Sequence, residues 1–206
     1  TSNNSIYILF SNMQIKKIGT CSFNDCIVLD GEYIYMKKYN KHVFLGFDLI
    51  HYNGVFYNNN NLLKEKYNKM CEIINKEFDF KYNNYEGKMV IDDIIKYHKK
   101  EITNYFKIFN KEMTNKNDVL ITYKYFIFPI GINNSEIYAY ANLIYTLYYE
   151  NKLPPYNIDG IIFTPTIDNK KNIYKWKPTE QNSIDFYIEF EKDSKGNIVN
   201  VFNNMN

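Results

Sequence analysis

Residues 26–50 read CIVLDGEYIYMKKYNKHVFLGFDLI, two apolar runs rich in β-branched and aromatic residues with a short polar segment between them. This pattern predicts two strands, Cys26–Met36 and His42–Ile50. Similar stretches predict further strands elsewhere in the chain, at 6–10, 14–18, 119–128, 158–164, 172–177, 183–190 and 198–202. So many short strands exclude an all-helical protein.

Three segments have helical spacing instead, because apolar residues recur every three or four positions. The apolar positions are Leu63, Tyr67, Met70, Ile74 and Phe78 in the first; Ile91, Ile94, His98, Ile102, Tyr105 and Phe109 in the second; and Ile137, Tyr140, Ile144 and Tyr148 in the third. Pro154 and Pro155 stop the third helix. Strands, then helices, then strands predict an α+β fold of mostly antiparallel sheets flanked by helices.

The composition limits the class of protein. At 206 residues and 45% hydrophobic, the chain is long enough for one main domain, and no run is long and apolar enough for a membrane helix. We therefore expect a soluble intracellular protein with no membrane partner. The three cysteines, Cys21, Cys26 and Cys71, match no zinc or redox spacing and are expected to be reduced thiols.

Charge says little about partners, since a net charge of +2 does not indicate a nucleic-acid-binding face by itself. All 25 cationic residues are lysine, and Asn, Ile and Tyr are also abundant, which indicates an A/T-rich genome. Most of the 21 tyrosines and 15 phenylalanines are therefore expected to fill the core and surface, although some could stack on bases.

Two stretches in the first quarter of the chain carry acids. In Val28-Leu-Asp30-Gly31-Glu32, a strand is expected to break at the glycine and present two carboxylates, although Asp-Gly alone is commonest in turns. The second stretch runs from Phe44 through Phe47 and Asp48 to Asn53-Gly54, and alone it predicts a strand followed by a hairpin turn. We expect Asp48 to fix the strand and not to touch a ligand.

Two stretches near the end of the chain complete the set. Asp159-Gly160 opens a buried strand that runs to Pro165, and 173–178 reads IYKWKP. Period two places Lys175 and Lys177 on one strand face and Trp176 on the other. Two aligned ammonium groups repel each other, so the face is either exposed to solvent or holds a polyanion.

In this order the four stretches resemble motifs III, IIIa, IV and V of the covalent nucleotidyltransferases, the family of mRNA-capping guanylyltransferases and nucleic-acid ligases. Residues 159–165 and 175–178, followed by 182–186 (NSIDF), resemble capping enzymes in particular. The resemblance covers about residues 1–190, with a divergent middle from Tyr57 to Pro155. It implies a nucleotidyltransferase domain of the ATP-grasp-like kind over 1–178 and the beginning of an OB-fold over 179–206.

The resemblance also implies roles for single residues. Lys175 and Lys177 would contact the α-phosphate of GTP, and Glu32 and Asp159 would orient Mg²⁺ or Mn²⁺. Phe47 would stack on guanine, and Lys124 would match a lysine that reads the guanine carbonyl. The implied reaction moves GMP from GTP, through a lysyl-GMP intermediate, to the 5′ diphosphate end of RNA.

The sequence departs from the family in its nucleophile, because no Lys-x-Asp-Gly motif is present: Val28 and Asn157 stand where the lysine should be. We expect that motif upstream of Thr1. The alternatives are a noncatalytic RNA- or partner-binding module on the same fold, or an ATP-dependent nucleic-acid ligase.

The resemblance leaves open whether triphosphatase and methyltransferase domains or subunits accompany the chain. The expected source is a virus, a cytoplasmic plasmid or a parasite. A cytoplasmic or virion location follows for a viral or plasmid protein, and a nuclear location for a cellular enzyme.

Overall fold

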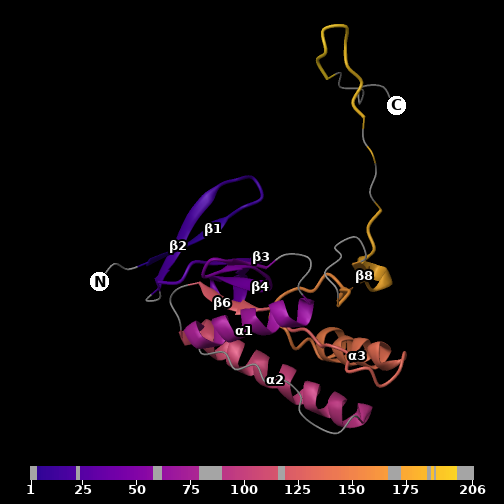
Figure 1. Ribbon diagram of the computed structural model, residues 1–206. Coiled ribbons are helices and arrows are strands. Elements are labelled where there is room, and N and C mark those ends of the chain that lie inside the picture. The colour runs from indigo at the N-terminus through magenta and orange to yellow at the C-terminus, as the bar shows by residue number, and fades with distance from the viewer. Residues whose placement is uncertain are drawn as a thin grey trace. The chain divides into compact units, whose positions relative to one another are not determined.

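The computed structural model describes residues 4–21, 24–57, 62–78, 90–115, 119–166, 173–184, 187 and 189–198. The chain divides into two compact units, Thr1–Trp176 and Lys177–Asn206. The first unit contains the sheets and the three α-helices, and the second begins at the end of the last strand (Figure 1).

Eight strands form three separate sheets in the described residues. They are β1 (Asn4–Leu9), β2 (Ile15–Cys21), β3 (Ile27–Met36), β4 (Lys41–Tyr52), β5 (Val55–Phe56), β6 (Leu120–Tyr123), β7 (Ile161–Phe163) and β8 (Tyr174–Trp176). β1 and β2 form a hairpin, β3, β4 and β5 form an antiparallel ladder, and β7 pairs antiparallel with β8. β6 also pairs with β4, on the edge opposite β3, and runs parallel to it. The expected mostly antiparallel pairing is confirmed.

The helices are α1 (Leu63–Phe78), α2 (Ile91–Asn115) and α3 (Glu136–Tyr145), with short 3₁₀ turns η1 (Lys37–Tyr39) and η4 (Thr179–Gln181). α3 runs directly into a π-helical turn, η2 (Thr146–Glu150). The helical segment ends at Glu150, shortly before Pro154 and Pro155, as those prolines predict. Figure 1 shows α1 and α2 lying together on one side of the β3, β4 and β6 sheet.

One hydrophobic core joins the sheet to the helices. It contains buried residues of β4 such as Leu45, of β6 such as Leu120, and of α1 and α2 such as Met70 and Phe109. The predicted stripes of the first two helices are confirmed at every position whose side chain is described, except Ile91, which is only partly buried. The third stripe is shifted. Of the predicted positions, Tyr140 is buried and Ile137 is exposed, while Glu136, Leu143 and Leu147 are buried without having been predicted.

Several predicted strands are shorter or missing. The segment 119–128 pairs only over β6, and the described residues of 183–190 are not in a strand. Asp185, Phe186 and residues 199–202 lie outside the described residues. Residues 193–197 form a turn in which the Asp193 carboxylate accepts hydrogen bonds from the backbone N–H groups of Lys195 and Asn197. Lys192 and Ile198 form one bridge across that turn. The OB-fold over 179–206 stays a prediction.

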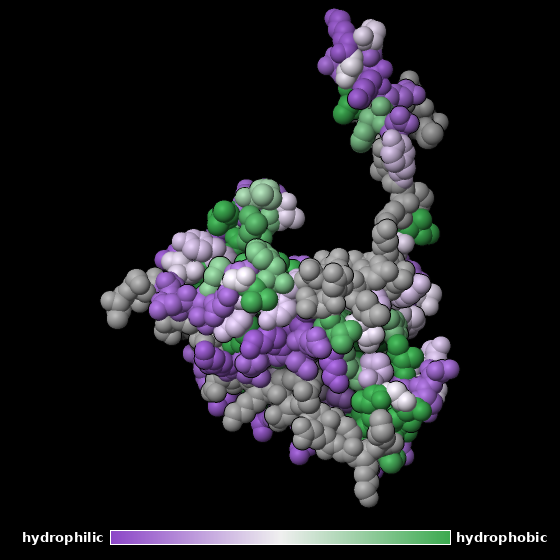
Figure 2. All heavy atoms as spheres, viewed as in Figure 1, coloured by the Kyte–Doolittle hydropathy of each residue, from purple (hydrophilic) through white to green (hydrophobic). Residues whose placement is uncertain are grey.

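The β1–β2 hairpin carries exposed apolar side chains. Leu9, Met13 and Ile15 are 60%, 75% and 70% exposed, and Figure 2 shows hydrophobic residues gathered on this hairpin. None of its residues belongs to the core cluster of the described chain. Within the described ranges, no helix is both long and apolar enough to cross a membrane.

Candidate functional site

The Asp30-Gly31-Glu32 stretch lies in the middle of β3, so the expected break at the glycine is wrong. Gly31 is required there by close approach: a Cβ would lie 2.5 Å from the Phe44 ring and 2.6 Å from the backbone oxygen of Leu45. Those atoms belong to the paired strand β4, which leaves no room for a side chain. Asp30 and Glu32 are both exposed.

Phe47 occupies a β-bulge in β4. Asp30 pairs with Asp48 and Gly31 with Gly46, so Phe47 is an extra residue with no partner on β3. A bulge changes the direction of the side chains around it and is common beside functional sites. In this strand Phe47 is partly buried, whereas Asp48 is buried.

The parallel pairing of β6 with β4 brings Lys124 to Phe47. The Lys124 backbone N–H donates to the Gly46 carbonyl at 2.8 Å, directly after Gly46 pairs with Tyr123. The Lys124 ammonium lies 5.2 Å from the centre of the Phe47 ring and donates to Glu32 Oε1 at 2.5 Å. Three predicted site residues, from β3, from β4 and from directly after β6, therefore meet at one point.

Tyr156 packs against the hydrophobic core near Glu32. Burial, and next the nearby charge of Glu32, raise the pKa of Tyr156, so its hydroxyl stays neutral. Its ring contacts Phe106 and Phe109 of α2. Glu32 thus has a lysine as its ion-pair partner and an un-ionised phenol nearby.

Two residues of α1 that the sequence did not assign to the site contact the same segments. Lys66 Nζ lies 2.7 Å from Asp48 Oδ1, and both side chains are buried, at 2% and 10% exposure. The Tyr67 hydroxyl donates to the Lys124 carbonyl at 2.7 Å. In the sequence, Lys66 lies beside Leu63, Tyr67 and Met70 on the apolar stripe of this helix. A lysine on an apolar stripe is the sequence signal that could have identified it.

Asp159 and Lys175 form a second pair. Lys175 Nζ donates to Asp159 Oδ2 at 2.6 Å, and the two side chains are 39% and 67% exposed. Gly160 between them has φ +127°, and a Cβ there would lie 2.4 Å from the Trp176 carbonyl oxygen. Trp176 contacts the rings of Tyr145 and Tyr149, so Lys175 and Trp176 have different neighbours, as period two predicts.

Lys177 is the first residue of the second unit, and β8 ends at Trp176. The shared strand face of Lys175 and Lys177 therefore stays a prediction. The role of each predicted site residue is likewise a prediction, although the contacts place Glu32, Phe47 and Lys124 together and Asp159 with Lys175.

Other reactive side chains lie outside these two pairs. His98 on α2 is buried, with Nδ1 3.1 Å from the Tyr125 hydroxyl, and burial lowers its pKa to about 4. No disulfide joins Cys21, Cys26 or Cys71. Across the ranges described above, no three His, Cys, Asp or Glu side chains come together as a metal cluster.

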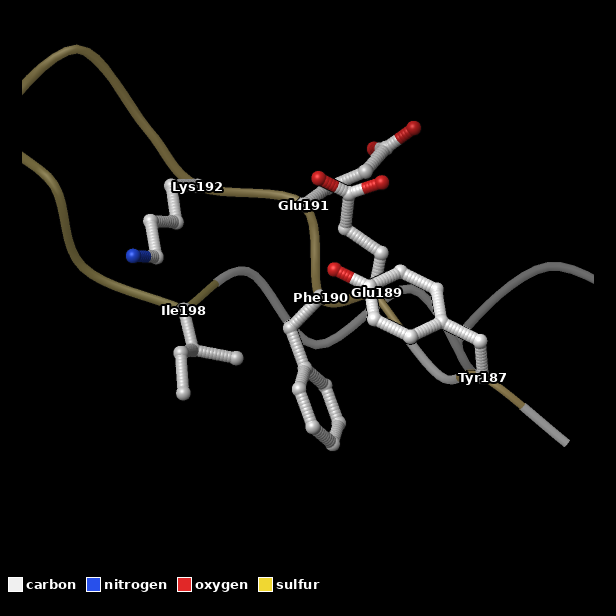
Figure 3. Close-up of a pocket in the computed structure, with 6 residues that line it drawn as sticks. All are labelled: Tyr187, Glu189, Phe190, Glu191, Lys192 and Ile198. Carbon is white, nitrogen blue, oxygen red and sulfur yellow. The ribbon is translucent and has the colours of Figure 1, made fainter. Parts of the chain in front are cut away.

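A concavity also lies in the second unit (Figure 3). It is lined by Tyr187, Glu189, Phe190, Glu191, Lys192 and Ile198. None of these is a predicted site residue, and residues beside them lie outside the described part. We therefore place the candidate site at the two lysine–carboxylate pairs.

Comparison with known proteins gives one relative. The chain is 38% identical over 216 residues to a probable mRNA-capping enzyme of Acanthamoeba polyphaga mimivirus, and the match covers 94% of the chain. The chain spans 18% of that relative's length. No protein-family model and no solved structure matches it. The resemblance to mRNA-capping enzymes that the four sequence stretches indicated is thus confirmed.

Proposed function

We propose that this chain forms the nucleotide-binding part of an mRNA guanylyltransferase. The observation that carries the proposal is the meeting of Phe47, Lys124 and Glu32 at one point of the sheet. An aromatic face and a cation beside it are what a purine ring with a carbonyl oxygen needs. The similarity to a probable mRNA-capping enzyme supports the same function.

In the proposed complex, guanine stacks on Phe47 and its carbonyl oxygen accepts a hydrogen bond from Lys124. The Lys124 ammonium now pairs with Glu32, and the Lys124 side chain is 24% exposed. Its proximity to both the ring and the carboxylate means that a small rotation of the side chain suffices to reach the base. The bulge at Phe47 keeps the ring partly accessible.

Lys175 and Lys177 are proposed to hold the α-phosphate. In the reaction, a lysine nitrogen attacks the α-phosphorus, the bond to pyrophosphate breaks, and the nitrogen loses a proton. An oxygen of the 5′ diphosphate of RNA then attacks the same phosphorus, and the P–N bond breaks. Each step moves charge onto phosphoryl oxygens, which fixed ammonium groups stabilise.

Glu32 and Asp159 are the candidate ligands for Mg²⁺ or Mn²⁺. Each carboxylate pairs with a lysine, and both are at least half exposed. Two carboxylates are too few to form a closed site, but they suit Mg²⁺, which keeps several waters and binds mainly to nucleotide phosphates. The donor set therefore fits an ion that enters with GTP, which would supply positive charge at the phosphates.

The nucleophile is proposed to come from the longer protein, because these 206 residues hold no Lys-x-Asp-Gly motif. The test uses the full-length natural protein with Mg²⁺ and either α-³²P-GTP or α-³²P-ATP. We expect a label from GTP alone that survives base and is lost in acid, as a phosphoramidate requires. Labelling by ATP alone would favour a ligase, and labelling by neither would favour the noncatalytic module.

A further inference from the structure

Two neighbouring residues of α1, Lys66 and Tyr67, contact the two chain segments that carry the proposed guanine site. Lys66 contacts Asp48, the residue after Phe47, and Tyr67 contacts the backbone of Lys124. Neither side chain is aimed at the site itself, since Lys66 is 1% and Tyr67 0% exposed.

The Lys66–Asp48 pair fixes β4 at its bulge. Asp48 Oδ1 lies 2.7 Å from Lys66 Nζ and also accepts the backbone N–H of Leu49 at 2.9 Å. Buried charges need a well-formed partner, so this geometry tolerates little movement. Phe47 has no partner on β3, and the pair formed by its neighbour Asp48 restricts the direction of its ring.

Tyr67 does the same for the end of β6. The β6 ladder stops at Tyr123, and the backbone beyond it needs other hydrogen-bond partners. The Tyr67 hydroxyl donates to the Lys124 carbonyl at 2.7 Å and accepts the Phe126 N–H at 3.3 Å. One hydroxyl thus takes the place of the missing strand partner on both sides of Tyr125.

The Tyr67 ring cannot easily turn away. It contacts the rings of Tyr123, Phe126 and Phe128 at centroid distances of 6.0, 4.8 and 5.5 Å. The packed ring therefore fixes the Tyr67 hydroxyl, and the hydrogen bond from that hydroxyl fixes the Lys124 carbonyl. The backbone position of Lys124 in turn sets where its ammonium can reach.

We propose that Lys66 and Tyr67 are positioning residues that fix the distance between the Phe47 ring and the Lys124 ammonium, and thereby the selectivity for guanine. This inference rests on the proposed function. Because the two contacts come from adjacent residues of one helix, a shift of α1 would move both parts of the guanine site together.

The test is the labelling of the full-length protein with GTP and with 2-aminopurine riboside triphosphate, which lacks the six-carbonyl oxygen. The first variant is Tyr67→Phe, which keeps the packed ring and removes only the hydroxyl. The second is Asp48→Asn with Lys66→Met, which removes both buried charges together. In each, we expect KM for GTP to rise about tenfold, kcat to change less than about threefold, and the preference for GTP to fall about tenfold.

Matched controls come from η1 and the start of β4. Tyr39→Phe removes a hydroxyl that donates to Asn110 at 2.6 Å, and Lys41→Met removes an ammonium that donates to the Met113 carbonyl at 2.8 Å. Both should lower the melting temperature without changing the preference for GTP. Lys66→Arg keeps the charge and should retain most of the wild-type preference.

The outcomes separate the two ideas. Wild-type labelling with an unchanged preference and KM in both test variants would overturn the positioning role alone. The positioning role would also be overturned if the test variants and the control variants lost the preference for GTP equally. A wild-type protein that takes no GMP would overturn the proposed function, and the positioning role with it.

Discussion

Replacing Gly160 with alanine tests whether the glycine is there to admit a neighbouring strand. A Cβ at this position would lie 2.4 Å from the Trp176 carbonyl oxygen and 3.1 Å from Lys175 Cε. The lysine side chain can move, but the carbonyl is backbone of β8, which pairs with β7 at Ile161. The pairing of β7 with β8 must therefore open to make room.

The expected loss has two parts. Alanine at φ +127° costs roughly 1–3 kcal/mol of backbone strain, because that region is essentially restricted to glycine. The forced close contact adds roughly 1–3 kcal/mol. We expect the free energy of unfolding in urea to fall by about 3 kcal/mol, and labelling by GTP in the full-length protein to fall with it, since Asp159 and Lys175 adjoin the displaced strands.

Gly54→Ala is the matched control. Gly54 also has a positive φ, +83°, but no atom lies within 4 Å of a Cβ there. It should show backbone strain alone, about 1 kcal/mol, and normal labelling. Equal destabilisation of the two variants, or normal labelling by Gly160→Ala, would refute the close-approach explanation.

Three further predictions concern single side chains. The pKa of His98 is about 4 in the folded state against 6.5 unfolded, so the unfolded state binds more protons between these two values. The free energy of unfolding should therefore fall as pH drops from 6.5 to 4. Urea unfolding of His98→Phe should show no such pH dependence. Burial raises the pKa of Glu136, but hydrogen bonds from Tyr140 and the backbone of 130–132 outweigh it and hold the pKa below 4.5. The Glu136 carboxylate therefore stabilises the folded state at neutral pH, and this stabilisation is lost as pH falls through the lowered pKa. Glu136→Gln leaves two of four donors without an acceptor and should cost about 3 kcal/mol at pH 7, by urea unfolding. Lys175→Gln should cut enzyme-GMP formation about 10²-fold with little change in melting temperature, because its exposed pair contributes little to stability; normal labelling would remove Lys175 from the site.

Periodicity predicted β3, β4 and the first two helices well, because each buries one face against a shared core. It predicted β6 too long, since the sequence of 119–128 stays apolar after strand pairing stops and the Tyr67 hydroxyl takes over. The shift in α3 has a similar origin. Glu136 is buried because it accepts three backbone N–H groups, which no apolar pattern reveals.

The site was predictable as residue types and not as an arrangement. Motif resemblance selected Glu32, Phe47 and Lys124, but their meeting depends on a parallel pairing of β4 with β6 across more than seventy residues. The bulge at Phe47 depends on register, which appears only when both strands are paired. The buried Lys66 carried a sequence signal, a charge on an apolar stripe, but its partner Asp48 lies on another element.

The two lysine–carboxylate pairs, Glu32 with Lys124 and Asp159 with Lys175, together carry no net charge. Neutral pairs produce a field that weakens quickly with distance, so these groups would attract a polyanion only at close range. GTP association with the full-length protein should then depend weakly on ionic strength, unlike capture by unpaired lysines. Free phosphate would have to displace a carboxylate from each lysine, whereas a nucleotide that arrives with a divalent cation gives each released carboxylate a new partner. Because each lysine would exchange its carboxylate for a phosphate and each carboxylate its lysine for the cation, the site would favour metal-bound GTP over simpler anions.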